Sequence, residues 1–314
     1  MRIVFFGTPH FAVEILDALL KAGLNLVALV TRPDKPKGRN LQLHSSPVKL
    51  YHAENRLSMP LFQPEKASHP DFIEILSQLK PDFFVVVGYG EILRQTLLDV
   101  PEKAPINIHT SLLPAYRGAA PIQRAMMAGE RTIGITIMKM NALMDAGEIL
   151  LQKSITISEN DCYPVVEKRM IQIASTGIVE VLVDFSTYQK SARTQDLSRV
   201  SHAPKIEQED CQISWDQPAE KILCQIKALT PRPSAWTTFF LNGSPKRVKI
   251  LDAVYLDGFS PFKQLTLNEG RLLVGCGLGT LEFLQLQLEG KGVMSARDFL
   301  NGYQQFFPIS LELS

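Results

Sequence analysis

Residues 107–150 read NIHTSLLPAYRGAAPIQRAMMAGERTIGITIMKMNALMDAGEIL, and this stretch decides both the fold and the chemistry. Asn107 and His109 lie two positions apart on a predicted strand, so their side chains point to the same face of it. Asp145 follows a second predicted strand, in a turn that Gly147 permits. After the first strand runs a loop, SLLPAYRGAAP at 111–121, that is too rich in Gly, Pro and Ala to be a helix. The stretch therefore predicts a sheet edge that carries an amide, an imidazole and a carboxylate.

Outward from this stretch, short apolar runs alternate with amphipathic segments through the first 190 residues. Apolar runs predict strands, and apolar residues spaced three or four positions apart predict helices. Strands that alternate with helices are typical of a parallel sheet covered on both faces. We therefore expect an α/β domain with a Rossmann-like parallel sheet over residues 1–190. The predicted strands are 2–6, 24–30, 59–62, 82–87, 106–110 and 131–140, and the predicted helices are 11–22, 48–55, 70–79, 92–99 and 163–185.

The composition changes after this domain. Residues 186–210 are polar and charged and have no periodicity, which is typical of an extended linker, and we place that linker at 191–205. Beyond it, residues 206–314 combine one predicted helix with several short strands separated by turn signals. This pattern favours a small β-barrel. The helix is predicted at 220–229 and the strands at 236–241, 247–255, 271–276 and 281–288.

The overall composition bounds the class of protein. The 314 residues are 45% hydrophobic and 21% charged with a net charge of +1, so no global positive field attracts nucleic acid. The four cysteines have no metal-ligand spacing and are expected to be reduced thiols, with no metal site. No apolar run reaches the ~18 residues of a membrane span, and the N-terminus lacks a signal-peptide pattern. These features predict a cytoplasmic enzyme.

The amide, imidazole and carboxylate fit the transfer of a formyl group to an amine. Attack on the formyl carbon creates an oxyanion, to which the Asn107 amide and a protonated His109 could donate, each donor being worth ~10²–10³ in rate. Asp145 would fix the tautomer of His109, favour its charged form and help to move the proton. An amine with a pKa near ~7.7 needs no serine or cysteine nucleophile. The alternative is that Asn107 and His109 are satisfied polar residues at a strand end, unless the fold brings Asp145 to them.

Two regions carry concentrated positive charge. The loop 31–48, TRPDKPKGRNLQLHSSPV, is long for a connection in this fold class, and a basic loop at the active-site edge suits a polyanion. A solvated charged loop is the alternative. Residues 221–263 hold seven basic and two acidic residues, so one side of the second domain could also be positive. The cations of the long loop are Arg32, Lys35, Lys37 and Arg39.

These motifs strongly resemble the methionyl-tRNA formyltransferase signature, within the wider group of 10-formyltetrahydrofolate-dependent formyltransferases. The likeness extends from FFGTPHFA at 5–12, through the basic loop and LTPRPSAWTTF, to VMSARDFLNG near the end. The resemblance implies a Rossmann-like formyltransferase domain followed by an OB-like β-barrel at 206–314 that contacts tRNA. It also implies 10-formyltetrahydrofolate as formyl donor and initiator methionyl-tRNA as acceptor. Nothing in the sequence suggests a dimer interface, so we expect a monomer.

The resemblance assigns roles to individual positions. The family's catalytic residues correspond to Asn107, His109 and Asp145. Its folate-binding segment corresponds to Ser111, Leu112, Leu113 and Pro114, and the backbone of 88–93 would line the pterin pocket. The loop that meets the acceptor end of the tRNA corresponds to Lys35, Lys37 and Arg39.

The chain departs from the family pattern at two positions, and rival readings remain. Ala146 follows the catalytic aspartate where threonine is common, and Arg124 stands where an aromatic residue is usual, a change expected on a helix surface or in packing. A formyltransferase for an amino-sugar nucleotide is the main alternative, but it has no need of a long basic loop. A glycinamide ribonucleotide formyltransferase would need only the first domain. A non-catalytic RNA-binding protein would not need the three motif residues.

Overall fold

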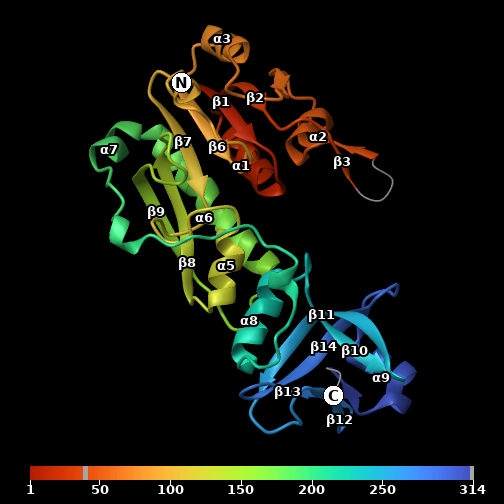
Figure 1. The fold of residues 1–314 in the computed structure, drawn as a ribbon. Helices are drawn as coiled ribbons and strands as arrows, with labels where there is room; N and C mark the ends of the chain where they lie inside the picture. Colours follow the sequence, from red (N-terminus) through yellow and green to blue (C-terminus); the bar gives the residue numbers. More distant parts are fainter. Residues whose placement is uncertain (38–41, 312–314) are drawn as a thin grey trace. The chain divides into compact units, whose positions relative to one another are not determined.

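The computed structural model describes residues 1–37 and 42–311, and the chain forms two compact units (Figure 1). Asn107, His109 and Asp145 lie in the first unit, and the predicted barrel lies in the second. The first unit comprises Met1–Gly118, Ile133–Ile155 and Glu167–His202, and the second comprises Ala119–Thr132, Thr156–Val166 and Ala203–Ser314.

The first unit is built on a seven-stranded sheet with the order β5-β2-β1-β6-β7-β8-β9. The first five strands in this order pair in parallel, which confirms the predicted Rossmann-like class. The prediction of a parallel sheet fails at β8, which runs antiparallel to β7, with His109 opposite Thr136. The strands are β1 (Arg2–Gly7), β2 (Asn25–Val30), β5 (Leu61–Phe62), β6 (Phe83–Val87), β7 (Ala104–His109), β8 (Thr132–Lys139) and β9 (Glu148–Thr156).

Helices cover both faces of this sheet because its central strands are apolar on both sides. All five residues of β6 are buried. Phe84 and Val86 belong to a core shared with α3 and α4, whereas the ring of Phe83 lies 4.9 Å from that of Phe185 in α7. In α6, a Cβ on Gly177 would lie 3.1 Å from the Ile137 side chain, so this helix packs closely on β8. The helices are α1 (His10–Lys21), α2 (Pro47–Glu54), α3 (Pro70–Gln78), α4 (Gln95–Leu98), α6 (Tyr163–Val183) and α7 (Phe185–Lys190).

Two segments of the first unit differ from the prediction. The helix expected at 92–99 is only the single turn of α4, and β9 was not predicted. The long basic loop contains a short hairpin of β3 (Lys35–Lys37) and β4 (Gln42–His44).

The second unit contains a closed six-stranded barrel. Its strand order is β11-β10-β16-β12-β13-β14, and β14 pairs back with β11, which confirms the predicted OB-like class. Phe239, Leu272 and Phe283 fill the interior without solvent exposure. The strands are β10 (Ala235–Leu241), β11 (Ser244–Leu256), β12 (Gln264–Asn268), β13 (Arg271–Gly275), β14 (Thr280–Leu288), β15 (Met294–Ser295) and β16 (Ile309–Ser310), and the helices are α5 (Pro121–Ala128), α8 (Ala219–Leu229) and α9 (Ala296–Tyr303).

Candidate active site

The structure brings His109 and Asp145 together. His109 Nδ1 lies 3.6 Å from Asp145 Oδ1, and the two side chains are only 8% and 13% exposed. This distance fits an ion pair but is too long for a hydrogen bond. The condition that the sequence left open, that Asp145 reach His109, is therefore met.

The other ring nitrogen of His109 is fixed by the loop that follows β7. His109 Nε2 lies 2.9 Å from the carbonyl oxygen of Tyr116. A carbonyl can only accept a hydrogen bond, so Nε2 carries the hydrogen in this contact. Nδ1 is then the nitrogen that faces Asp145 and remains able to exchange a proton.

Asn107 lies on the same strand face as His109 and is half-buried. The described residues give its side-chain amide no hydrogen-bond partner. A half-buried amide normally satisfies its polar atoms within the protein or with a ligand or water. The Asn107 amide is therefore available to a bound substrate.

Asp145 sits in a turn whose backbone is unusual. Its φ of 51° lies in the left-handed region, which is uncommon for any residue other than glycine. Two residues later, a Cβ on Gly147 would lie 1.9 Å from the Lys139 carbonyl oxygen, so the turn requires glycine there. Asp145 Oδ2 accepts a hydrogen bond of 2.9 Å from the Gly118 backbone N–H. The carboxylate is therefore aimed by its own turn and by the loop after β7.

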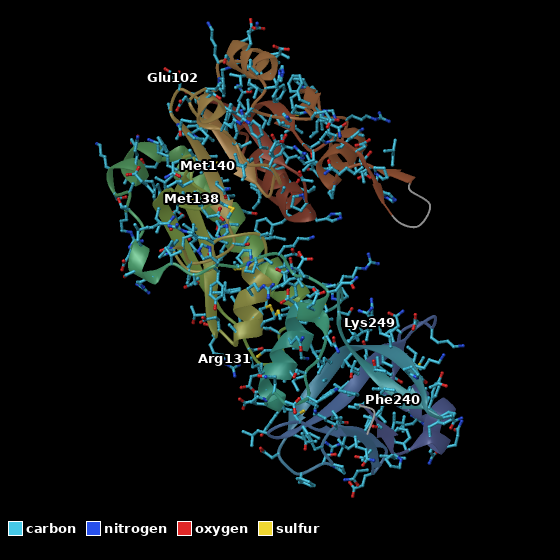
Figure 2. All side chains as sticks on the ribbon, in the orientation of Figure 1. Glu102, Arg131, Met138, Met140, Phe240 and Lys249 are labelled. Atoms are coloured by element: carbon cyan, nitrogen blue, oxygen red, sulfur yellow. The ribbon has the colours of Figure 1, made fainter. Side chains whose placement is uncertain are left out.

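The path of this turn follows from the reversed strand. β8 ends beside the beginning of β7, where the Met140 N–H donates to the Pro105 carbonyl over 2.8 Å. Met138 and Met140, at this end of β8, are labelled in Figure 2. Asp145 therefore approaches His109 from a connection that a fully parallel sheet would have placed differently.

The SLLP segment is held by side chains from β8 and β9. Thr136 Oγ1 donates to the Ser111 carbonyl over 2.7 Å and accepts from the Leu113 N–H over 3.0 Å. Gln152 Nε2 donates to the Leu113 carbonyl over 2.8 Å. Ser111 Oγ donates to the carbonyl of Ala115 over 2.6 Å. These bonds give the segment one defined backbone conformation.

The loop after β6 contains a buried tyrosine beside a charged pair. Tyr89 is 2% exposed, and burial raises the pKa of its hydroxyl to about 12. The Arg32 guanidinium lies 5.8 Å from the centre of its ring and forms an ion pair with Glu91. Arg32, which the sequence suggested for a polyanion, is thus already paired within the protein.

The remaining cations of the basic loop are only partly described. Lys35 is exposed at the start of β3. Arg39 and the side chain of Lys37 lie outside the described residues. At the base of the loop, Lys49 Nζ donates to Asp34 over 2.7 Å, and this bond lowers the pKa of the Asp34 carboxyl. The base of the loop is therefore anchored to α2.

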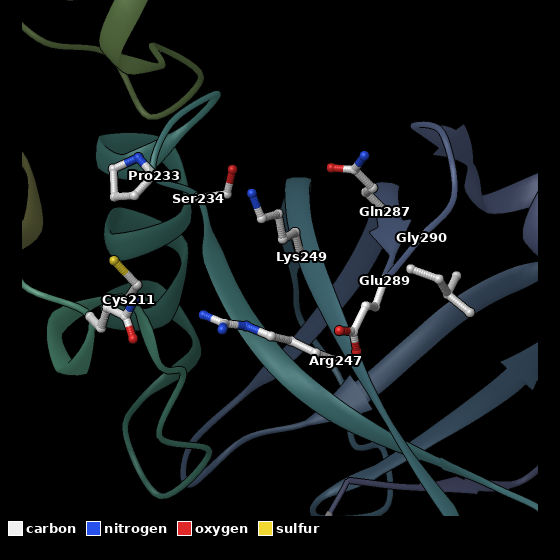
Figure 3. Close-up of a pocket in the computed structure, with 10 residues that line it drawn as sticks. Cys211, Pro233, Ser234, Arg247, Lys249, Gln287, Glu289 and Gly290 are labelled. Carbon is white, nitrogen blue, oxygen red and sulfur yellow. The ribbon is translucent and has the colours of Figure 1, made fainter. Parts of the chain in front are cut away.

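The barrel unit has a basic cavity of about 440 Å³ (Figure 3). Arg247 and Lys249 leave the same strand, β11, and the Arg247 guanidinium stacks 4.0 Å from the centre of the Trp236 ring. Lys249 is also labelled in Figure 2. Among the described residues neither cation has an ion-pair partner. The cavity is lined by Gln208, Cys211, Pro233, Ser234, Arg247, Lys249, Gln287, Leu288, Glu289 and Gly290.

Three other cations of the second unit form ion pairs with neighbouring carboxylates. Lys227 and Lys263 pair with Asp252 and Asp216, at 2.7 and 3.1 Å. Arg124 donates to both carboxylate oxygens of Asp210 over 2.7 and 2.5 Å, which lowers the pKa of that carboxyl. The arginine that replaces the family's usual aromatic residue is therefore half of an ion pair.

Sequence reasoning missed two residues that contact the site. Gln195 and Ser201 lie in the stretch predicted as a linker, yet both hydrogen-bond to the loops that carry Tyr116 and Asp145. No local pattern distinguishes them from their polar neighbours. Their partners are 50 and 85 positions away in the chain, so only the fold reveals them.

Within residues 1–37 and 42–311, no cluster of three or more His, Cys, Asp or Glu side chains could hold a metal ion. In the same residues no helix is long and apolar enough to cross a membrane.

Comparison with known proteins agrees with the geometry. The chain matches the formyl transferase family over residues 1–182 and the formyl transferase C-terminal domain over 205–304. It is 40% identical over 304 residues to a methionyl-tRNA formyltransferase of Protochlamydia amoebophila, covering 96% of this chain and 95% of that one. The chain belongs to the methionyl-tRNA formyltransferase family. Another family member, from Bartonella bacilliformis, is 40% identical over 303 residues, covering 96% of this chain and 97% of that one.

Solved structures share the fold of this formyltransferase at low sequence identity. HypX from Aquifex aeolicus, determined with tetrahydrofolic acid, aligns with a TM-score of 0.64 at 17% identity. The alignment covers 97% of this chain and 48% of HypX, so this chain spans about half of that protein. An N-formyltransferase from Helicobacter canadensis, in complex with folinic acid and dTDP-3-aminofucose, aligns with a TM-score of 0.64 at 16% identity over 90% of this chain and 98% of that one.

Proposed function

We propose that this enzyme transfers the formyl group of 10-formyltetrahydrofolate to the α-amino group of initiator methionyl-tRNA, giving N-formylmethionyl-tRNA for translation initiation. The observation that carries the proposal is the His109–Asp145 pair on the strand face of Asn107, whose amide has no partner among the described residues, in a chain of this family. Since the acceptor is a charged tRNA, we place the reaction in the cytoplasm, where translation starts. One chain supplies all three groups, so a monomer suffices.

The proposed chemistry is direct attack of the amine on the formyl carbon. As the new C–N bond forms, the formyl oxygen becomes negative, and the Asn107 amide and the Nδ1–H of a doubly protonated His109 ring donate to it. Asp145 accepts the proton that the amine loses. When the tetrahedral carbon collapses, its bond to the folate nitrogen breaks, and that nitrogen takes up the proton. The contact between Nε2 and the Tyr116 carbonyl supports the choice of Nδ1 as the donor.

The substrates are assigned to the segments that the family resemblance indicates. We place the folate donor along Ser111, Leu112, Leu113 and Pro114, a segment whose backbone is fixed by Thr136 and Gln152. We place the tRNA acceptor end at Lys35, Lys37 and Arg39. Arg247 and Lys249 of the barrel are the proposed contacts for its phosphate backbone, because they are cations without an ion-pair partner in the part of the chain that the structure describes.

A transfer assay with formyl-labelled 10-formyltetrahydrofolate tests this function. Initiator methionyl-tRNA, elongator methionyl-tRNA and an amino-sugar nucleotide are offered in parallel to the same enzyme. Label on the initiator tRNA alone is expected. Label on the sugar nucleotide alone would keep the catalytic groups and overturn the assigned acceptor. No label on any acceptor, from folded enzyme, would overturn the proposed reaction.

A further inference from the structure

Gln195 is a buried amide whose polar atoms are all used near the active site. It is 5% exposed, and its Nε2 donates to the carbonyl oxygens of Asp145 and Gly147, each over 2.9 Å. Its Oε1 accepts from Nε and Nη2 of Arg117 over 3.2 and 2.7 Å. Only an amide can donate to two carbonyls and accept from a guanidinium at the same position. The chemistry of the side chain, beyond its size, is therefore specified.

The two carbonyls that Gln195 binds flank the turn that carries the Asp145 carboxylate. A non-glycine residue at positive φ is costly, and such a conformation persists where its surroundings hold it. Gln195 ties down both sides of this turn, and the Gly118 N–H holds the carboxylate itself. Release of the two carbonyls would let the turn relax and move Asp145 Oδ1 relative to His109.

The same segment also holds the loop that orients His109. Ser201 Oγ accepts from the Tyr116 N–H, and the Ser201 carbonyl accepts from the Arg117 N–H, each over 2.9 Å. Tyr116 has a φ of 61°, and its carbonyl is the group that binds His109 Nε2. Ser201 therefore fixes, through Tyr116, the ring nitrogen that does not face Asp145.

We propose that Gln195 is a positioning residue for Asp145 and that Ser201 is its counterpart for His109. Both act through the backbone of other residues and touch no substrate. This inference rests on the proposed catalytic role of the His109–Asp145 pair, which it deepens. Its central claim is that the stretch from 193 to 202 sets the relative placement of the two catalytic side chains.

The chain supplies a matched control for Gln195. Gln225 of α8 also donates from Nε2 to two backbone carbonyls two positions apart, those of Asp210 and Gln212, over 2.8 and 3.0 Å. It lies in the second compact unit, and neither of these hydrogen bonds is to the loops that carry Tyr116 and Asp145. A purely structural role for such an amide predicts the same consequences at both positions.

The first test compares Gln195→Glu and Gln195→Met with Gln225→Glu and Gln225→Met. Neither replacement can donate to the two carbonyls. Methionine adds no charge, so the methionine variants still test the proposal if a buried glutamate prevents folding. A displacement of about 1 Å can cost ~10²-fold in rate, so we expect kcat to fall about 10- to 100-fold in the Gln195 variants with each KM within about threefold. The Gln225 variants should keep wild-type kcat. Equal kcat at both positions, in folded variants, would overturn the proposal.

A double-mutant cycle distinguishes positioning from a general loss of structure. If Gln195 acts through Asp145, Gln195→Met should cost much less in kcat when Asp145→Ala is already present, because the group it positions has gone. Single-turnover rates make the weak activity measurable. If Gln195→Met lowers kcat by the same factor with and without Asp145→Ala, the positioning role is overturned.

A third readout does not depend on the identity of the acceptor. The ¹⁵N shifts of the His109 ring report its tautomer and hydrogen bonds, and His109→Asn assigns them among the six histidines. Gln195→Met and Ser201→Ala should both change these shifts, and Gln225→Met should not. If wild-type enzyme formylates no tRNA while the shifts change as expected, the proposed function fails and the positioning role stands. Unchanged shifts in both variants would overturn the positioning role.

Discussion

The polar groups around His109 and those around Arg247 differ in burial and in hydrogen bonding. Around His109, the ring and the Asp145 carboxylate are almost fully buried, and backbone groups of the loop after β7 bind both. On the barrel, Arg247 and Lys249 line a cavity together with Glu289, and the Arg247 guanidinium stacks on Trp236. Neither cation forms an ion pair with another described residue. One region holds its charges in a fixed geometry, and the other presents them.

This difference separates two kinds of contribution. Buried groups in fixed positions stabilise charge that develops during reaction, and they are little affected by salt because solvent does not screen them. Exposed cations attract a polyanion through many weak terms that fall with added salt. Substitutions should therefore have large effects on turnover in the first region and small effects on binding in the second.

The largest effect is expected at the catalytic residues. Asn107→Ala removes a donor to the oxyanion, and Asp145→Ala removes the partner of His109. Either change should lower kcat by ~10²-fold or more while tRNA affinity stays within about twofold. Steady-state kinetics with a filter-binding assay measures both quantities. Near-normal turnover in both variants would contradict the proposed mechanism. It would also contradict the view that the buried groups around His109 control turnover.

A smaller effect is expected at the basic loop. Arg39→Ala should lower the rate at limiting tRNA by about tenfold, or ~1.4 kcal/mol, because one contact to the acceptor end is lost. The KM for the folate donor should not change. The measurement is kcat/KM for each substrate in turn. An unchanged rate at limiting tRNA would mean that the loop is only a solvated charged segment.

The barrel cations should change the salt dependence of binding. A plot of log affinity for tRNA against log salt concentration should have a negative slope. Arg247→Ala and Lys249→Ala should each reduce the magnitude of that slope by about 1. Lys190→Ala, an exposed lysine of α7, serves as the control and should leave the slope unchanged. A wild-type slope near zero would contradict the assignment of the barrel to RNA.

The smallest effect concerns a paired cation of the barrel unit. Asp210→Asn should lower the stability of this unit by about 1 kcal/mol at pH 7, since it breaks the two-bond pair with Arg124. Arg124 lowers the pKa of Asp210 in the folded state, so its contribution is complete above the ordinary aspartate pKa of about 4. It is then lost as the pH falls through the lowered value.

Thermal unfolding of wild type and variant between pH 8 and 3 measures this contribution. Glu159→Gln is the control, because its pair with Arg131 is 62% and 75% exposed and should contribute almost nothing. A stability difference that does not narrow toward pH 3 would show that the Asp210 pair is not its source.

The sequence predicted those parts of the fold whose signal is local. FFVVV in β6 is buried at every position, as a continuous apolar run in a parallel sheet should be. β9 was missed because its second half, QKSIT, mixes polar residues into a strand at the sheet edge. β16 has only two residues, too few for any periodicity. The direction of β8 is set by pairing with β7, which no residue of either strand encodes alone.

The candidate site divides in the same way. Asn107 and His109 share a face because residues two apart on a strand must do so, and the glycine requirement at 147 marks a tight turn. The approach of Asp145 to His109 depends on tertiary structure and could only be stated as a condition. Gln195 was hidden for a stronger reason, since it lies in a stretch whose composition resembles a linker.

The position of Gln195 and Ser201 affects how this enzyme can be divided. The family match for the first domain ends at residue 182, and the composition suggested an end at 190. A fragment cut at either point would keep Asn107, His109 and Asp145 but lose the amide and hydroxyl that hold their loops. The smallest piece that contains the whole hydrogen-bonded site extends to His202, where the first compact unit ends. Truncations, gene fusions and domain exchanges within this family should therefore cut the chain after that residue. A cut before it would separate the three motif residues from the Gln195 and Ser201 side chains that hold their loops.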